Sequence, residues 1–180
     1  MTCIVAIRKG EKAYLGADAA AVNSMQITPR KDPKVFMNGQ FGIAYTSSFR
    51  MGDILQYSWK APTWRPNEIA LAAFMRTVFI DSIIQIFRDK GYGKSSADSD
   101  KTGGSFLVGV QGRIFTIQDD FQVGEELLDY LADGSGFAYA YGSLHSTGGV
   151  KDPKERLTMA LEAAAFFAPG VQGPFTIIEC

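Results

Sequence analysis

The chain has 180 residues, of which 46% are hydrophobic, and its formal net charge at pH 7 is −1. This length suits one domain over residues 1–180, with enough apolar side chains for a sizeable core. The balanced charge excludes the basic footprint of a nucleic-acid-binding protein, and no run of like charge marks an interaction tail.

Neither a disulfide-rich secreted protein nor a membrane protein is indicated. The two cysteines, Cys3 and Cys180, do not make a disulfide framework, which favours a reducing compartment, and we expect the protein in the cytoplasm. The N-terminal apolar run is too short for a signal peptide. The most apolar segment, 69–87, carries Arg76 and Asp81 in its middle, and such charges are costly in lipid. We therefore expect no contact with a membrane.

Strand and hairpin signals fill the first quarter of the chain. Alternating apolar residues and turn dipeptides such as Asn38-Gly39 predict paired strands. Residues 19–33 are weakly patterned and contain two prolines, so we expect a loop there. The predicted strands are 2–7, 12–18, 34–37 and 41–45.

Helices and further strands alternate over the rest of the chain. Pro66 suits the beginning of a long helix and Gly91 its end, and Asp152 is a suitable N-cap. The polar segment 92–104 is expected to be a loop. The predicted helices are 49–59, 66–90, 137–145 and 154–168, and the predicted strands are 105–110, 113–118, 121–123 and 175–179.

This order of elements predicts the fold class. Strands come in hairpins and do not alternate singly with helices, so the sheets should be mainly antiparallel. Two sheets packed face to face, with helices on their outer faces, would bury every apolar face. We therefore expect an α+β fold with two antiparallel sheets flanked by helices.

Thr2 is the most informative residue for function. It follows Met1, and a small residue at this position usually lets an aminopeptidase remove the methionine. Removal would leave Thr2 with a free α-amine, whose reference pKa is about 7.7–8.0, close to its own hydroxyl. One residue could then supply both nucleophile and base. Taken alone, Thr2 is more simply explained as an ordinary residue at the start of a strand.

Two downstream residues complete a catalytic set. Antiparallel pairing of 2–7 with 12–18 brings Asp18 back near Thr2, and Lys34 begins the next strand. A lysine beside the threonine hydroxyl would favour its deprotonated form, and Asp18 would pair with that lysine and fix its position. Singly, Asp18 could be a turn residue and Lys34 a solvated strand end.

With these residues, the sequence resembles the proteasome β-type and HslV-like N-terminal-nucleophile (Ntn) hydrolases. In that family an aspartate follows the threonine by sixteen residues and a lysine follows it by thirty-two, and both spacings occur here without a gap. The stretches that carry the resemblance are Thr2-Cys3-Ile4-Val5-Ala6, Leu15-Gly16-Ala17-Asp18, Lys34-Val35, and Gly134-Ser135-Gly136 followed by Tyr139-Ala140-Tyr141-Gly142.

The resemblance implies a fold, an activity and roles for single residues. The fold is a four-layer αββα sandwich, and the activity is hydrolysis of peptide amide bonds by subunits assembled into rings. Thr2 would attack the peptide amide bond, Lys34 would favour the deprotonated form of the Thr2 hydroxyl, and Asp18 would orient Lys34. Ser135 would hydrogen-bond the threonine amine, and the backbone N–H near Ser47 would stabilise the oxyanion.

Two departures from the family pattern keep a second interpretation open. The family's oxyanion turn usually has glycine where this chain has Ser47 or Ser48, and its C-terminal aspartate and second serine have no evident counterparts in 169–174. Retention of Met1 would also block the amine. The alternative to a threonine peptidase is a structural protein that keeps the fold as a subunit of a larger symmetric assembly, such as a virion, with catalysis reduced or absent.

Other chemistries find little support. His145 is the only histidine and has no obvious carboxylate partner, so we expect a capping or surface role. No Cys/His cluster has metal-ligand spacing, and no phosphate-binding loop is present, so we expect neither metal nor cofactor.

The predicted helix 66–90 also suggests partners. Apolar residues lie around much of its circumference, more than one sheet face would cover, which predicts a homo-oligomer, most simply a ring. With peptidase function, the other partners would be a peptide or unfolded-protein substrate and an unfoldase or larger assembly.

Overall fold

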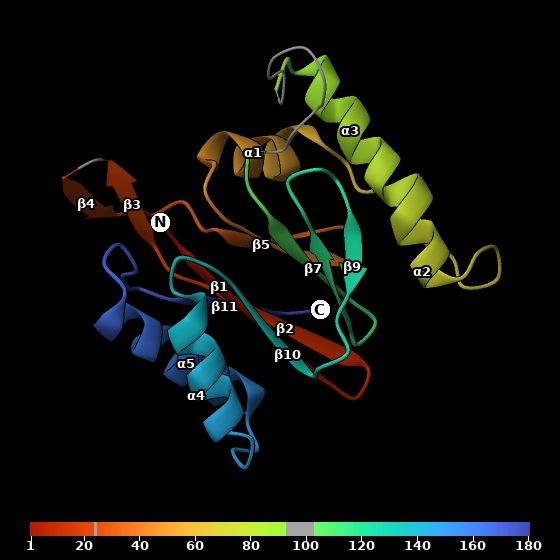
Figure 1. The fold of residues 1–180 in the computed structure, drawn as a ribbon. Helices are drawn as coiled ribbons and strands as arrows, with labels where there is room; N and C mark the ends of the chain where they lie inside the picture. Colours follow the sequence, from red (N-terminus) through yellow and green to blue (C-terminus); the bar gives the residue numbers. More distant parts are fainter. Residues whose placement is uncertain (24, 93–102) are drawn as a thin grey trace.

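The computed structural model describes residues 1–23, 25–92 and 103–180. Two antiparallel sheets pack face to face with helices on both outer faces, as Figure 1 shows. The first sheet has the order β10-β1-β2-β11 and the second the order β5-β6-β7-β8-β9. The predicted α+β sandwich is therefore confirmed. Most of the segment predicted as a loop over 92–104 lies outside the described residues.

The strand bounds agree with most of the predicted hairpins. In the first sheet they are β1 (Cys3–Lys9), β2 (Lys12–Ala17), β10 (Tyr130–Gly134) and β11 (Thr176–Glu179). In the second they are β5 (Val35–Asn38), β6 (Phe41–Tyr45), β7 (Phe106–Val110), β8 (Arg113–Ile117) and β9 (Val123–Glu125). The turn between β5 and β6 uses Gly39 at φ +60°, a conformation that favours glycine.

Helices cover both outer faces. On the second sheet lie α1 (Phe49–Asp53), continued by a π-helical turn at Ile54–Ser58, and a long helix made of α2 (Leu71–Phe74), a π-helical turn at Met75–Phe79 and α3 (Ile80–Asp89). On the first sheet lie α4 (Phe137–Ser146) and α5 (Pro153–Phe167). Asp152 caps α5 as expected, accepting a hydrogen bond from the Lys154 N–H at 3.0 Å.

Side chains along β1 point alternately to the two faces of the first sheet, which explains how the layers join. Ile4 and Ala6 pack between the two sheets, whereas Cys3, Val5 and Ile7 pack against α4 and α5. Both sets are almost fully buried because β1 lies in the middle of the sandwich. Its N-terminal end, and with it Thr2, is therefore fixed by packing on two faces.

Two local predictions were wrong, and one strand was missed. Residues 19–33 are not all loop, because β3 (Ala20–Asn23) and β4 (Gln26–Pro29) form a two-stranded hairpin. The strand β10 was not predicted, yet it pairs with β1 along its whole length. The long helix begins at Leu71 rather than at Pro66.

The predicted apolar excess on the long helix is mostly covered within the chain. The segment after α1 packs against this helix, and the rings of Trp59 and Phe79 meet edge to face at 5.3 Å. Val78 of this helix remains 47% exposed. The apolar surface of this helix therefore does not support the prediction of an oligomer.

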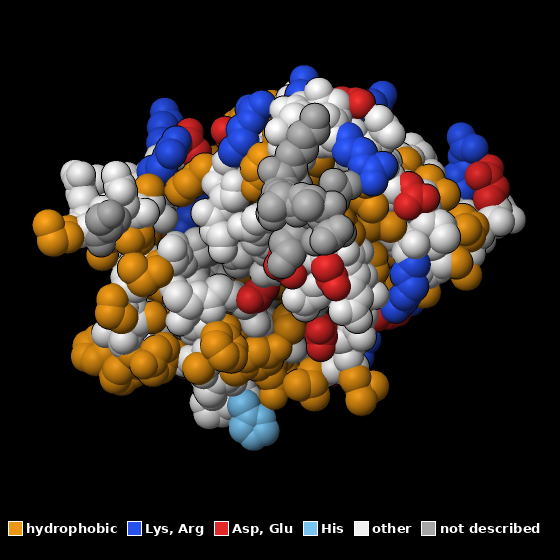
Figure 2. All heavy atoms as spheres, turned by 45° about the horizontal axis from the view of Figure 1, so that its top comes forward, with side chains coloured by type: hydrophobic (Ala, Val, Ile, Leu, Met, Phe, Trp, Pro, Cys, Tyr) orange, Lys and Arg blue, Asp and Glu red, His pale blue; other side chains and the backbone are white. Residues whose placement is uncertain are grey.

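An exposed apolar surface lies elsewhere, on α4 and at the end of α5. Phe166 is 82% exposed, and the Phe167 ring stacks on Tyr139 at 5.3 Å. Figure 2 shows hydrophobic side chains gathered on the side of the molecule where α4 and α5 lie in Figure 1. We call this surface the aromatic patch, and its members are Phe137, Tyr139, Phe166 and Phe167. In the described part of the chain, no helix has the length and apolar character to cross a membrane.

Candidate active site

The hairpin of β1 and β2 brings Asp18 to Thr2. Ile4 pairs with Ala17, so the next residues outward are also neighbours, and the Asp18 N–H donates to the Cys3 carbonyl at 3.2 Å. The spacing of sixteen residues between Thr2 and Asp18 thus follows from one tight hairpin. Thr2 is 4% exposed and Asp18 is 2% exposed.

Lys34 approaches the same point from the second sheet. It directly precedes β5, and Val35 belongs to the apolar cluster between the two sheets that also contains Ile4. The Lys34 ammonium donates to Thr2 Oγ1 at 3.1 Å and to Asp18 Oδ1 at 2.9 Å. The three residues singled out from the sequence spacing therefore form one hydrogen-bonded group.

The Asp18 carboxylate is held on both oxygens. Besides Lys34, Oδ1 accepts from the Cys3 N–H at 3.0 Å, and Oδ2 accepts from the Ala20 N–H at 2.9 Å and from the Gln172 N–H at 3.4 Å. A buried carboxylate with this many donors is satisfied and rigid. It can fix the direction from which the lysine faces Thr2.

Burial changes the acid–base behaviour of Lys34. Desolvation lowers the pKa of its ammonium from the usual 10.5, and the adjacent Asp18 carboxylate opposes that shift. The Asp18 carboxylate therefore favours the charged form of Lys34. A cation held 3.1 Å from a hydroxyl oxygen favours loss of the hydroxyl proton.

Ser135 lies on the other side of Thr2. Its Oγ accepts from Thr2 N at 3.1 Å and lies 3.3 Å from the Thr2 carbonyl oxygen, to which it donates. Gly134 has φ +90°, and a Cβ on it would stand 2.3 Å from that carbonyl oxygen. The glycine therefore allows the serine turn to close on Thr2.

Met1 covers the amine in the described chain. Thr2 N is a peptide nitrogen here, and Thr2 Oγ1 donates to the Met1 carbonyl at 2.6 Å. The Met1 side chain is 54% exposed. Removal of Met1 would free the Thr2 amine and would take away the acceptor of the hydroxyl. Ser135 already faces the Thr2 nitrogen, and Lys34 already faces the Thr2 hydroxyl.

Ser47 lies in the turn between β6 and α1, where the resemblance puts the oxyanion donor. Its φ is +64°, which is uncommon for a residue other than glycine. Ser48 follows as the N-cap of α1 and accepts from the Met51 N–H at 3.2 Å. Ser47 lines the same small cavity as Thr2 and Lys34, of about 60 Å³.

A larger cleft adjoins this cavity. It has a volume of about 520 Å³ and shares Ser47 with the small cavity. Ser135, the partner of Thr2 N, also lines it. Sequence reasoning missed two lining residues, Ser105 and Asp133, because they meet only through packing of the two sheets. Thr2 lines the small cavity, which meets the larger cleft at Ser47.

Other reactive groups lie outside this arrangement. Burial, followed by the nearby Asp18 and Asp133, raises the pKa of the Cys3 thiol to about 12, so it is a poor nucleophile. His145 Nδ1 pairs with the Tyr130 hydroxyl at 3.0 Å on the surface. Within residues 1–23, 25–92 and 103–180, His, Cys, Asp and Glu nowhere form a group of three that could hold a metal ion.

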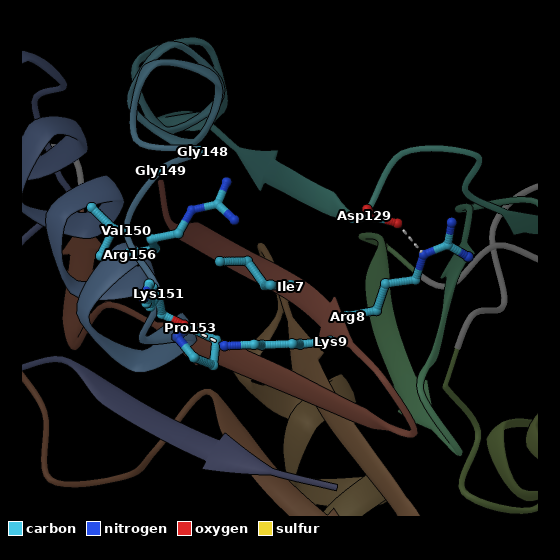
Figure 3. A pocket seen from close by; sticks show the side chains of 10 residues that line it. All are labelled: Ile7, Arg8, Lys9, Asp129, Gly148, Gly149, Val150, Lys151, Pro153 and Arg156. Atoms are coloured by element: carbon cyan, nitrogen blue, oxygen red, sulfur yellow. Dashed lines mark hydrogen bonds and ion pairs between the residues drawn. The ribbon is translucent and has the colours of Figure 1, made fainter.

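A further cavity, of about 320 Å³, lies near the opposite end of β1 and is drawn in Figure 3. Arg8 points away from its helical wall and pairs with Asp129 at 2.7 Å, whereas Lys9 points toward the Lys151 carbonyl and donates to it. Arg8 and Lys9 therefore already have partners within the chain. This cavity contains none of the residues around Thr2.

Comparisons with known proteins agree with the fold. No family model matches the chain, and no curated protein matches it either. Among solved structures, BPH from Thiobacillus denitrificans is similar with a TM-score of 0.80 and 18% identity, covering 99% of this chain and 97% of that one. HslV from Trypanosoma brucei has a TM-score of 0.68 and 15% identity, covering 99% and 98%.

A third similar structure is Anbu, an ancestral beta-subunit, from Yersinia bercovieri, with a TM-score of 0.64, 12% identity and coverage of 99% and 81%. At these identities the similarity shows the fold. The chain has the proteasome-like, HslV-like Ntn-hydrolase fold over nearly its whole length, as the residues around Thr2 predicted.

Proposed function

We propose that this chain is a proteasome-like threonine peptidase in which Thr2, freed by removal of Met1, is the nucleophile. The observation that carries the proposal is the hydrogen-bonded group of Lys34, Thr2 Oγ1 and Asp18, with its distances of 3.1 and 2.9 Å. Ser135 at 3.1 Å from Thr2 N adds the fourth expected member.

Each residue has a defined part in the proposed reaction. Thr2 Oγ attacks the carbonyl carbon of a peptide bond, and the free amine takes the hydroxyl proton. The proton then passes to the leaving nitrogen as the C–N bond breaks, which leaves an ester on Thr2. Water attacks this ester, giving one proton back through the amine to Oγ and releasing the acid product.

The surrounding groups stabilise charge during these steps. The Lys34 ammonium favours the developing alkoxide, and Asp18 keeps that ammonium charged and in place. The Ser47 N–H donates to the oxyanion of the tetrahedral intermediate, and Ser135 holds the amine. The cleft of about 520 Å³ holds the peptide, and the reaction needs no cofactor.

The chain assembles with copies of itself through the aromatic patch. Phe166 at 82% and Phe167 at 59% exposure are unusual for a surface facing water, and both lie beside a cavity of about 390 Å³. A contiguous aromatic surface is typical of a protein interface. A ring would put Thr2 inside a compartment that admits only unfolded segments. The same interface would serve a structural subunit without catalysis.

Covalent labelling tests the proposal and separates these two possibilities. Epoxomicin is bound in one solved structure of T. denitrificans BPH, so it is a suitable probe. After intact mass has established loss of Met1, the wild-type chain should form one adduct that maps to Thr2, and Thr2→Ala should form none. An assembled, Met1-free chain that neither reacts nor cleaves peptides would favour the structural subunit.

A further inference from the structure

A hydrogen-bonded bridge crosses from one sheet to the other beside Thr2. Asp133 lies in β10 of the first sheet, opposite Ile4, and Ser105 directly precedes β7 of the second sheet. The Ser105 hydroxyl donates to Asp133 Oδ2. The bond is therefore made between layers, at the end of the sandwich where Thr2 lies.

On the first sheet, the bridge reaches the serine that faces the Thr2 amine. Asp133 Oδ1 accepts from the Gly134 N–H at 2.6 Å. Gly134 has φ +90° and pairs with Cys3 of β1, and Ser135, which faces Thr2 N, follows it. The Asp133 carboxylate thus fixes the first peptide of the turn that carries Ser135.

On the second sheet, the bridge reaches the turn with the proposed oxyanion donor. The Thr46 N–H donates to the Ser105 carbonyl at 3.0 Å, and the Ser105 N–H donates to Thr46 Oγ1 at 3.2 Å. Thr46 is 3% exposed, and the next residue, Ser47, has φ +64°. Ser105 therefore holds the residue that leads into this strained turn.

We propose that Asp133 is a positioning residue that, through Ser105, holds the Ser47 turn and the Ser135 turn at a fixed separation around Thr2. A bond from a hydroxyl to a carboxylate is stronger than one between neutral groups, which suits a link between two layers. The bridge gives the Ser135 turn a support that does not come from residues 169–174. The inference rests on the proposed function, because the two turns matter as parts of a threonine peptidase site.

Backbone hydrogen exchange tests the bridge without any need for activity. Asp133→Ala should speed exchange of the Gly134 amide by tenfold or more, and exchange of the Ser105 and Thr46 amides should also rise if the two turns are linked. Asp133→Asn and Ser105→Ala, which keep more of the local volume, provide the same comparison if Asp133→Ala folds poorly. Unchanged exchange at Ser105 and Thr46 would overturn the proposal.

The control variant is Asp129→Asn. Asp129 lies four residues earlier on the same segment, pairs with Arg8 and lines the distant cavity of Figure 3. It should leave exchange at all three amides unchanged, because it contacts neither turn. If it produced the same changes as Asp133→Ala, a general loosening of β10 would replace the bridge as the explanation.

Kinetics add a readout that a merely structural role would not move. In active protein, Asp133→Asn and Ser105→Ala should each lower kcat by about tenfold or more with KM within about twofold, since oxyanion stabilisation acts in the transition state. Their double variant should lose little more, and Ser105→Thr should retain most of kcat.

The two proposals can fail separately. If wild-type protein without Met1 has no activity, the proposed function fails and the exchange results alone decide whether the bridge holds the turns. If the wild type is active but kcat of Asp133→Asn is unchanged, the peptidase stands and the positioning role is wrong.

Discussion

The Lys34 ammonium lies 3.1 Å from the Thr2 hydroxyl oxygen, although the two residues begin strands of different sheets. Their approach depends on the packing of the two sheets, where Val35 and Ile4 belong to one apolar cluster. Lys34 is only 2% exposed, so its charge is not a solvated strand end. A buried cation aimed at a hydroxyl is costly to keep, and such arrangements are concentrated at functional sites.

Replacing Lys34 should therefore affect turnover far more than a surface lysine does. Lys34→Ala is expected to lower kcat by about 10²-fold or more, because the alkoxide loses its adjacent positive charge. Lys34→Arg should not restore it, since a planar guanidinium does not fit the place of a compact ammonium. Peptide hydrolysis by purified variants measures both effects.

Lys154→Ala is the matched control for that comparison. The Lys154 ammonium lies on the surface, 3.8 Å from a Glu179 carboxylate oxygen, far in sequence from the Thr2 group. Its removal should leave kcat unchanged. Wild-type turnover in Lys34→Ala would show that the lysine does not act on Thr2.

The pH profile should reflect both Thr2 and Lys34. After loss of Met1, the Thr2 amine must be unprotonated to act as base, so kcat/KM should rise through a pKa of about 7.7–8.0. Burial lowers the pKa of Lys34 below 10.5, so its charge and the activity should be lost as pH rises through that lowered value. Activity that stays constant to above pH 10.5 in folded protein would contradict the role of Lys34.

Gly134 should tolerate no side chain. A Cβ there would stand 2.3 Å from the Thr2 carbonyl oxygen, and φ is +90°. Gly134→Ala is thus expected to lower the free energy of unfolding by about 2 kcal/mol or more and to displace Ser135 from Thr2. Thermal and denaturant unfolding measure the first effect, and peptide hydrolysis measures the second.

Gly142→Ala provides the contrast. Gly142 lies within α4 and has no heavy atom within 4 Å of an added Cβ. Alanine there should be neutral or stabilise the chain by about 0.5–1 kcal/mol, because it favours helix. Equal losses in the two variants would mean that Gly134 is not specially required.

Assembly should depend on the aromatic patch. Phe166→Ser combined with Phe167→Ser removes its two most exposed rings at 82% and 59% exposure, and is expected to shift the protein toward a monomer of 19.6 kDa. Light scattering at several concentrations measures this. Val78→Ser, at a site on the long helix that is 47% exposed, should leave the assembly intact. A wild-type chain that is already monomeric at high micromolar concentration would exclude the oligomer.

Sequence reasoning worked where a short-range rule governs the structure. The spacing from Thr2 to Asp18 is set by one hairpin, so these two residues could be brought together without knowing the rest. Lys34 lies beside the other sheet, and only the spacing shared with the resembling family placed it next to them. Proline and polar residues concealed β3 and β4, whose strands are short and largely exposed.

The remaining features depend on contacts between distant segments. Strand β10 exists because it completes the sheet beside β1, against the turn preference of Asp133 and Gly134. The bond from Ser105 to Asp133 needs both sheets in place, and no spacing in the sequence encodes it. Coverage of the long helix likewise depends on how Trp59 packs against it.

Turnover by the chain without Met1 tests the central claim most directly. Protein whose N-terminus is shown by intact mass to be Thr2 should hydrolyse small peptide amides, Thr2→Ala should have no activity above background, and Thr2→Ser should keep a measurable fraction because it preserves a hydroxyl beside the amine. A folded, Met1-free wild-type chain with no more activity than Thr2→Ala would contradict the assignment of Thr2 as the nucleophile.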